Sequence, residues 1–370
     1  MSNNTEAHLF IIWEFARYKE KEILNKIENK LRIVEVYDLQ WSASFFSSNL
    51  TRFYGQKLPK NSFKEKHCGK GSFLLVICED MNPTHQNRDT ISRGIEKVNT
   101  NIFDLKHEFR KMTGGGHKIH ATNNPSETNH DLTLLLGINS HDYDIENKPT
   151  WDRRIIRLSR DLPGACGWKS INDLFYVINS CEDYVVLRNF EGLPNLVTLD
   201  EHDDIDFLVR NYENFCYLVN GKKIFNKSYR VHHQLICGNQ KVLCDVRYIG
   251  DGYYDSVWQS EILKTRIMCK NFYIPSDENH KYSVLYHALM QKKYISHDYM
   301  TKIKVWFKNE NLDDLKVKLD SFMSRNDYKY IEPRDLTVFY INKRKSIKRR
   351  WFYILLEIKV FIRSLIKFDF

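Results

Sequence analysis

The first part of the chain alternates short apolar runs with an amphipathic segment, which is the pattern of a domain that mixes strands and helices. The apolar runs are short enough for buried strands, and the amphipathic segment has helical periodicity. The Gly114–Gly116 turn marks a break in the pattern. The pattern predicts strands at His8–Trp13, Arg32–Tyr37 and Gly71–Cys78, helices at Ala16–Leu31 and Thr128–Leu136, a loop at Asp80–Arg93 and a linker at Asn139–Trp151.

Beyond the linker the pattern is again mixed and then becomes largely helical. No internal repeat is evident. The pattern predicts helices at Ser170–Asn179, Asn279–Lys293 and Leu312–Met323, and strands at Asp183–Leu187, Ile205–Val209, Val242–Tyr248 and Leu336–Ile341. These elements divide the chain into a first domain at 1–140, a second at 150–300, a small helical unit at 301–342 and a tail at 343–370.

Composition narrows the class of protein. The 370 residues are 42% hydrophobic and 28% charged, which excludes a wholly disordered chain, a collagen and a polytopic membrane protein. The net charge is +9, but residues 341–370 hold nine basic and two acidic residues, so the rest carries only +2. This distribution argues against a surface built to coat nucleic acid. The eight cysteines form no CxxC pair and the first residues are polar, so we expect a cytoplasmic protein with free thiols.

The sharpest chemical signal is a set of three acidic residues within apolar strands. Asp204 and Asp206 stand two residues apart, which places both side chains on one face of a strand, and Asp245 lies in the strand predicted at Val242–Tyr248. Acids buried in strands need compensation, and Mg²⁺ or Mn²⁺ with oxygen ligands supplies it. The alternative is a solvated acidic turn at Asp200–Asp206, with Asp245 in an unrelated ion pair.

The order of these motifs resembles the DNA polymerase beta-like nucleotidyltransferase superfamily over about residues 165–300. The family has a strand, a small-residue turn that opens a helix, an Asp-x-Asp strand and a later strand with a single Asp. Here the strand is Tyr184–Arg188, and the turn at Arg188–Gly192 lacks the family's paired small residues. The resemblance implies a mixed-sheet domain in which the three aspartates hold the metal and one helps to deprotonate the acceptor. It also implies that Arg188, Asn189 and Arg247 bind the donor.

Further polar residues near these motifs are weaker candidates. Each has an ordinary alternative as a surface or core-edge hydrogen-bonding group. His287 lies on the apolar face of a predicted helix and is expected to be a core histidine. The candidates for phosphate binding or acid–base chemistry are Arg230, His232, His233, Lys264 and Arg266.

The first domain resembles nucleoside diphosphate kinases, which have a ferredoxin-like fold. Phe53-Tyr54 matches an aromatic pair on a family helix, Arg93 stands where that family has a phosphate-binding arginine, and His120 stands at the phosphohistidine. The first strand ends in Trp13-Glu14 instead of Lys-Pro. We therefore expect the fold, and either a phosphate-contacting or a structural His120, but not the kinase reaction. The matching segments are Leu9–Ile12, Arg32–Tyr37, Arg52–Gly55, Gly71–Ile77, Thr90–Gly94 and Lys118–Glu127.

The tail combines a basic cluster at Lys343–Arg350 with twenty residues rich in aromatic and aliphatic side chains. Lys359, Arg363 and Lys367 recur every fourth residue and form one stripe of a helix. This is the pattern of an amphipathic helix that lies in the plane of an anionic membrane. The alternatives are a terminal helix docked on the protein's own core, and binding of nucleic acid by the basic run.

Together these features predict a cytoplasmic transferase that lies peripherally on the inner face of the membrane. The resemblance to the choline-phosphate and fukutin-type ribitol-phosphate transferases implies a metal-dependent transfer of a phospho-alcohol. The donor would be a nucleotide-activated, CDP-linked compound and the acceptor a surface polysaccharide or lipid-linked glycan, with nucleic acid not expected as a partner. The alternatives are a nucleotidylyltransferase acting on a small molecule, protein or RNA, and a non-catalytic scaffold in glycan assembly.

Overall fold

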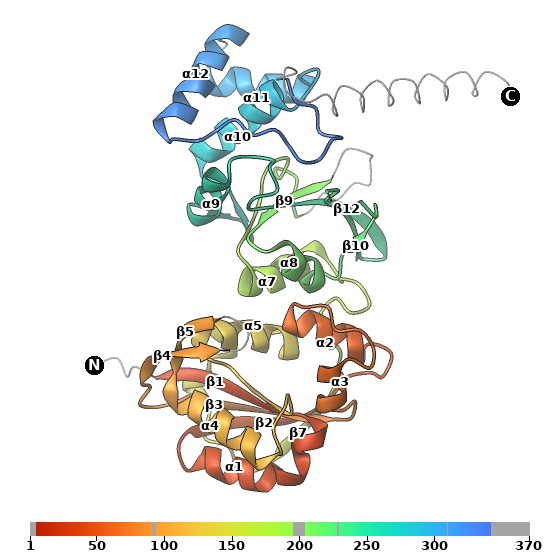
Figure 1. Cartoon of the computed structure of the whole chain (residues 1–370), viewed down its shortest axis with the longest axis vertical. Coiled ribbons are helices and arrows are strands. Elements are labelled where there is room, and N and C mark those ends of the chain that lie inside the picture. The colour runs from red at the N-terminus through yellow and green to blue at the C-terminus, as the bar shows by residue number, and fades with distance from the viewer. Residues whose placement is uncertain (1–4, 91–93, 195–203, 228, 309, 342–370) are drawn as a thin grey trace, which may run out of the picture. The chain divides into compact units, whose positions relative to one another are not determined.

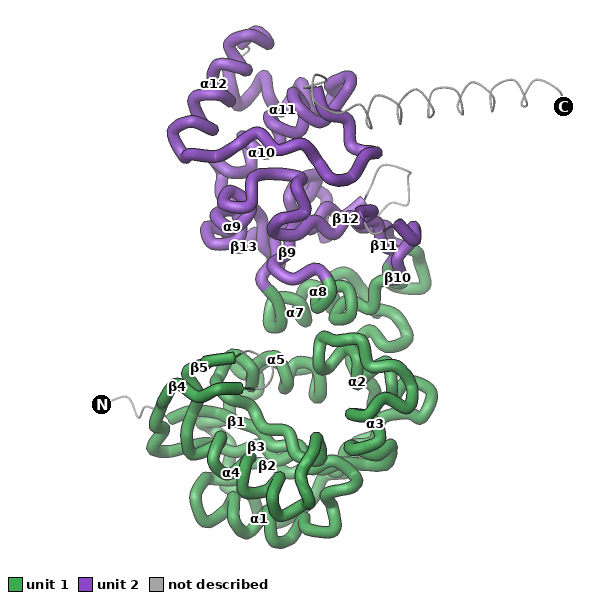
Figure 2. Tube along the Cα trace, in the orientation of Figure 1, with its two compact units in different colours: residues 1–182, 213–221, 235–241 green, residues 183–212, 222–234, 242–370 purple. Residues whose placement is uncertain are grey.

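The computed structural model describes residues 5–90, 94–194, 204–227, 229–308 and 310–341. The chain is of the mixed α/β class and divides into two compact units (Figure 2). Unit 1 comprises residues 1–182, 213–221 and 235–241, and unit 2 comprises residues 183–212, 222–234 and 242–370.

Unit 1 is built on a five-stranded sheet in the order β6-β1-β3-β2-β7 (Figure 1). Strand β1 lies between β6 and β3 and runs antiparallel to both, and β2 runs antiparallel to the central strand β3. With helices between β1 and β2 and between β3 and β6, this is the ferredoxin-like arrangement, as the sequence predicts. The strands of unit 1 are β1 (Glu6–Ile12), β2 (Arg32–Gln40), β3 (Phe73–Asp80), β4 (His85–Thr90), β5 (Gly94–Asn99), β6 (Ile119–Ala121) and β7 (Ile155–Ser159).

Helices cover both faces of this sheet. Phe10 and Ile12 of β1 face α1 and α4, with which they share a buried core, and α5 lies on the opposite face (Figure 1). The strand alternation that separates these faces follows from the period of two in β-structure. The helical segments are η1 (Glu14–Lys19), α1 (Glu20–Glu28), α2 (Phe46–Tyr54), α3 (Phe63–Cys68), α4 (Thr100–Met112), α5 (Pro125–Leu136), α6 (Ser140–Tyr143), η2 (Ile145–Asn147), α7 (Ile171–Cys181) and α8 (Tyr212–Leu218).

A second five-stranded sheet has the order β10-β11-β12-β9-β8. It is a mixed sheet, because β9 pairs antiparallel with β8 and parallel with β12. A small two-stranded sheet of β13 and β14 accompanies it in unit 2. The strands are β8 (Tyr184–Val186), β9 (Ile205–Val209), β10 (Lys222–Lys223), β11 (His232–Cys237), β12 (Gln240–Tyr248), β13 (Ile267–Cys269) and β14 (Phe272–Ile274).

One face of the β8–β9 region packs on four helices. Leu208 of β9, Trp258 of α9 and Phe322 of α12 belong to the same buried core. The helices predicted as a separate C-terminal unit therefore share a hydrophobic core with the second sheet. The helices are α9 (Ser256–Lys264), α10 (Asp277–Met290), α11 (His297–Trp306) and α12 (Leu312–Arg325).

Most of the predicted elements with clear periodicity are confirmed, including the helix at Thr128–Leu136 and the strand at Ile205–Val209. Two other predictions are wrong. Residues of the predicted loop Asp80–Arg93 form β4, a mostly exposed strand that pairs with β5 and so shows no apolar alternation. The Leu336–Ile341 run is not a strand, and Asp335 accepts a hydrogen bond from the Thr337 backbone in a turn there. Helices α9 and α11 were not predicted.

Unit 1 extends beyond the domain boundary that was predicted near residues 140–150. Strand β7 lies beyond that boundary, yet it pairs in parallel with β2 and completes the first sheet. The predicted membrane-facing tail at 343–370 lies outside the described residues. Within the described part of the chain, no helix is long and apolar enough to cross a membrane.

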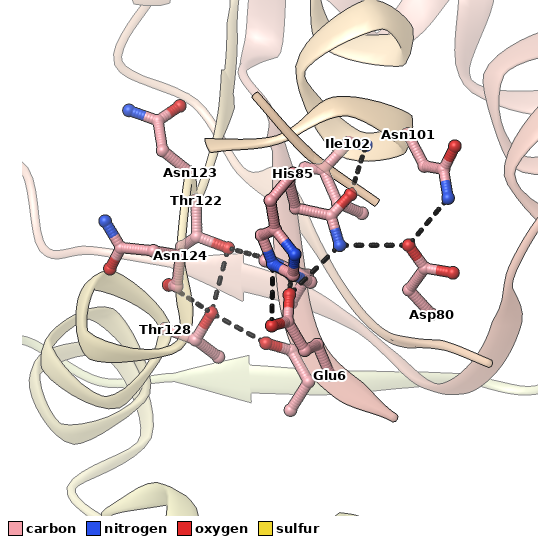
Figure 3. Close-up of polar contacts among 12 residues, drawn as sticks. Glu6, Asp80, His85, Asn101, Ile102, Thr122, Asn123, Asn124 and Thr128 are labelled. Atoms are coloured by element: carbon pink, nitrogen blue, oxygen red, sulfur yellow. Dashed lines mark hydrogen bonds and ion pairs between the residues drawn. The ribbon is translucent and has the colours of Figure 1, made fainter. Parts of the chain in front are cut away.

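A polar network joins the end of β3 to the start of β1 (Figure 3). The Glu6 carboxylate lies 2.8 Å from His85 Nε2 and accepts a hydrogen bond from Asn99 Nδ2 at 3.1 Å. Asn99 and Asn101 both donate to Asp80 Oδ2 at 2.9 Å. The network therefore ties the β4–β5 hairpin and the start of α4 to the sheet.

We expect Glu6→Gln to lower the free energy of unfolding at pH 7 by about 1–2 kcal/mol, because charge-assisted hydrogen bonds are lost. Burial by itself would raise the pKa of Glu6, but hydrogen bonds from Asn99 and His8 lower it overall. A lowered pKa means that the contribution to stability is present at neutral pH and lost as the pH falls through the folded-state value. The difference between wild type and variant should therefore shrink in acid.

Chemical denaturation at several pH values measures both effects. The matched control is Glu146→Gln, because Glu146 is exposed. Equal losses in the two variants would contradict the assigned role of the network.

Candidate active site

The candidate site in unit 2 begins with two carboxylates on neighbouring strands. Asp206 of β9 and Asp245 of β12 are direct partners in the parallel register. Strand alternation puts Asp206 on the same face as Leu208, which lies in the helix-covered core. Both aspartates are buried, with exposed fractions of 6% and 9%. The fold thus places two acids side by side where the apolar core ends.

Two buried arginines accompany these acids. Arg188 follows β8 and donates from Nη2 to Asp206 Oδ1 at 2.7 Å. Arg247, two residues beyond Asp245 on β12, lies 3.7 Å from the Asp245 carboxylate and 3.8 Å from that of Asp251. The two arginines lie beside the buried acids Asp206, Asp245 and Asp251, which reduces the penalty of removing each charge from water.

Some buried polar atoms of these residues form no hydrogen bond. Arg188 Nη1, Arg247 Nε and Asp245 Oδ1 are buried and have no hydrogen-bond partner among the described groups. His232 Nε2 lies 3.4 Å from Asp245 Oδ1, and the two groups form an ion pair when the ring is protonated. Buried polar atoms without partners are rare in folded proteins and indicate an absent ligand, ion or water. Carboxylates beside arginines fit a divalent cation together with a phosphate-bearing substrate.

The predicted three-aspartate cluster is only partly assembled. Asp204 precedes β9 and is half-buried. Within the described residues, the three-residue group whose ligand atoms all lie within 4.8 Å of one another is His120, Glu127 and Asp131, in unit 1. Among the described residues, Asp204, Asp206 and Asp245 do not form such a group, and Arg188 engages the Asp206 carboxylate.

The ionisation of Asp206 depends on burial and on the neighbouring charges. Burial raises the pKa of Asp206 to about 6, with the Arg188 charge opposing the rise and the Asp245 charge adding to it. A cation near this carboxylate would lower the pKa again, because an adjacent opposite charge favours the ionised form. Proton release and cation binding at Asp206 are therefore linked.

The other sequence candidates are dispersed. Asn189 is exposed with a left-handed backbone (φ 56°) in the turn after β8. Arg266 is used structurally, since it donates to Asp183 at 2.7 Å. His287 is a core histidine as predicted, 2.7 Å from the Tyr253 hydroxyl. Residues 195–203, where the resemblance places a helix, and Arg93 lie outside the described residues. The remaining candidates near the second sheet are Arg230, with Nε 3.9 Å from Asp335; His233, with Nδ1 3.0 Å from the Val231 carbonyl; and Lys264, in the last turn of α9.

Sequence reasoning missed three residues of this site. The Tyr253 ring lies 4.1 Å from the Arg247 guanidinium and 5.7 Å from that of Arg188, and so orients both. Asp251 shares Arg247 with Asp245. Lys292 is close enough to Arg188 for that charge to lower its pKa, after the larger effect of burial. None of the three belongs to a local motif, so only the tertiary structure identifies them.

His120 occupies a second polar cluster in unit 1. Its backbone position pairs with Ile11 of β1, on the sheet face that α5 covers. Nε2 of His120 lies 2.7 Å from Asp131 Oδ2 on α5, and the other Asp131 oxygen lies 2.8 Å from His130 Nδ1. Asn124 and Pro125 begin α5, with Asn124 accepting the Glu127 amide at 2.9 Å. Because the ionised carboxylate can only accept, Nε2 donates and Nδ1 is left for other chemistry.

Cations surround this histidine cluster. Burial lowers the pKa of Lys106 to about 8, and the Arg110 charge adds to the effect. Burial likewise lowers the pKa of Lys64 to about 8, and its Nζ lies 3.4 Å over the Tyr54 ring. Glu127 and Asp131 oppose this effect at Lys106, so the cluster holds acids as well as cations. Lys64, Lys106 and Arg110 are the groups of the cluster that suit an anionic ligand. The four-residue spacing of Lys106 and Arg110 on α4 was the sequence signal that could have found them.

Comparisons with known proteins add little to this geometry. No protein-family model matches the chain, and no curated protein matches it. Among solved structures, the chain is similar to the nucleoside diphosphate kinase of Aquifex aeolicus in an orthorhombic crystal form. The likeness has 16% sequence identity and a TM-score of 0.26, and it covers 37% of this chain and 98% of that one. The assignment of the ferredoxin-like fold rests on the strand order alone.

We expect Mn²⁺ to bind more tightly as the pH rises from 5 to 7, because Asp206, with a pKa of about 6, must ionise to hold a cation. The same raised pKa means that the contribution of Asp206 to folding stability is present in acid and lost as the pH rises through about 6. Electron paramagnetic resonance of free Mn²⁺ measures the affinity.

Asp206→Asn should abolish the pH dependence along with the binding. The exposed acid Asp277 in the first turn of α10 provides the control Asp277→Asn, which should bind like wild type. A wild-type affinity that does not change across this pH range would contradict the assignment.

Proposed function

We propose that unit 2 is a divalent-metal-dependent transferase that moves a phosphate-containing group, a phospho-alcohol from a CDP-activated donor, onto a glycan or lipid-linked hydroxyl. The observation that supports this proposal is the pairing of Asp206 with Asp245 between two buried arginines with unused N–H groups. Asp206 and Asp245, with Asp204 nearby in the chain, would hold the metal. A bound divalent cation supplies Lewis-acid stabilisation of the phosphoryl oxygens.

The protein's own groups have distinct parts in this proposal. Arg188 and Arg247 orient the donor phosphates, since their planar guanidinium groups match phosphate oxygens. Tyr253 fixes the planes of both guanidinium groups through its ring. Asp245, in contact range of His232, takes up the proton of the acceptor hydroxyl as the new bond to phosphorus forms. The bond to the nucleotide phosphate then breaks and CMP leaves.

Incubation with Mg²⁺ and either CDP-choline or CDP-ribitol tests the proposal by release of CMP. Asp206→Asn and Asp245→Asn should each slow release by about 100-fold or more, because several kcal/mol of charge stabilisation are lost. Asp277→Asn should keep the wild-type rate. Circular dichroism shows whether the inactive variants remain folded.

The other hypotheses give different results. Incorporation of label from a nucleoside triphosphate, without cleavage of either CDP compound, would favour a nucleotidylyltransferase. A folded Asp206→Asn protein that retains full biological activity would favour a non-catalytic scaffold.

A second candidate function belongs to unit 1, where we infer that a phosphate group binds beside His120. The support is the His120–Asp131 contact together with the cations Lys64, Lys106 and Arg110. With Nε2 held by Asp131, Nδ1 is the nitrogen that could attack a terminal phosphorus. The bond from phosphorus to the bridging oxygen would break, and the nucleoside diphosphate would leave.

Incubation with Mg²⁺ and ATP labelled on the γ-phosphate should then give an acid-labile, base-stable label on the protein. His120→Gln should carry no label, and His141→Gln, which changes a histidine with a 96% exposed side chain, should carry the wild-type amount. Absence of label from the wild-type protein would leave His120 with a structural role.

A further inference from the structure

A separate pocket in unit 1 contains a buried arginine that no carboxylate balances. The pocket has a volume of about 290 Å³ and lies between α2, the loop that follows it, and the end of α8. Arg52 of α2 forms part of its wall and is only 3% exposed. Burial lowers the pKa of Arg52 to about 10, and no acidic residue opposes this effect. A buried charge without a counter-ion is unfavourable, so the site is incomplete as it stands.

Backbone carbonyl groups hold the guanidinium in place. Arg52 Nε donates to the Tyr217 carbonyl at 3.3 Å, and Nη2 donates to the carbonyls of Leu218, at 3.0 Å, and Pro163. These bonds account for the position of Arg52 as a partner of the C-terminal end of α8. They do not account for Nη1, which is buried and has no hydrogen-bond partner.

The rest of the wall suits a small anion. Lys60 lines the pocket from an exposed loop position and brings a second positive charge. Ser48 and Thr51 contribute hydroxyl groups, and Asn220 contributes an amide. Its volume lies at the lower end of the range of roughly 300–1,000 Å³ that small-molecule pockets span, so it fits a small ligand.

We propose that this pocket binds a small oxyanion, the phosphate or carboxylate group of a small molecule, between Arg52 and Lys60. Arg52 would supply a buried guanidinium that backbone carbonyl groups hold in place, and Lys60 would supply an exposed second charge. The site shares no residue with the aspartates of unit 2 or with the His120 cluster, so its occupancy does not depend on either proposed function.

Isothermal titration calorimetry of the full chain tests the site with inorganic phosphate and, separately, with acetate, each against chloride at equal ionic strength. Lys60→Glu should weaken binding of the preferred anion by about tenfold or more, because a charge-assisted contact is replaced by repulsion. Lys57→Glu makes the same change at an exposed position of the same loop outside the pocket wall, and should bind as wild type does.

The outcome distinguishes this pocket from other anion sites in the chain. Phosphate bound only beside His120 or between Arg188 and Arg247 would show the same affinity in the two lysine variants, and this result would overturn the proposal. Absence of saturable binding of both anions to the wild-type protein would also overturn it. Preference for phosphate or for acetate identifies which oxyanion the pocket takes. Arg52→Gln is the less useful variant, because Arg52 also holds α8.

Discussion

The arrangement of unit 2 depends on the burial of four charges against a hydrophobic core. Asp206 and Asp245 lie in apolar strands, and neither could stay ionised there without Arg188 and Arg247. The Arg188–Asp206 contact at 2.7 Å is the tightest of these pairings. The contacts of Arg247 are longer and divided between two acids, so this half of the site retains polar atoms without partners. A cation and a phosphate would complete what the protein leaves open.

The two units differ in the charged residues that surround their candidate sites. In unit 2 buried arginines lie beside buried acids, which suits a ligand pair of a metal ion and an anion. In unit 1 the cations Lys64, Lys106 and Arg110 lie near His120 together with acids, and none of the described residues that line the Arg52 pocket is acidic. The Arg52 pocket therefore favours an anion. The chemistry of each site follows from its local charge balance more than from the fold that carries it.

Periodicity identified elements that bury one clear face. Thr128–Leu136 was predicted as a helix because its apolar residues repeat with the period of a helix. Ile205–Val209 was predicted as a strand because its apolar residues form one short run. The same reasoning failed for β4, since a hairpin strand exposed on both faces has polar residues throughout. It also failed for the boundary after the first sheet. Strand β7 carries exposed Ile155 and Ile156 and is recognisable only by its pairing with β2.

The amino-acid sequence by itself marked the acidic residues that became the candidate site. Two-residue spacing predicted that Asp204 and Asp206 share one strand face, and a third acid marked another apolar strand. Only the tertiary structure decided that Asp245 stands opposite Asp206, that the Tyr253 ring lies near both arginines, and that Arg52 has no acidic partner among the described residues. The physical reason is that spacing along the chain fixes direction within one element. Distances between elements depend on strand register and packing, which no local pattern encodes.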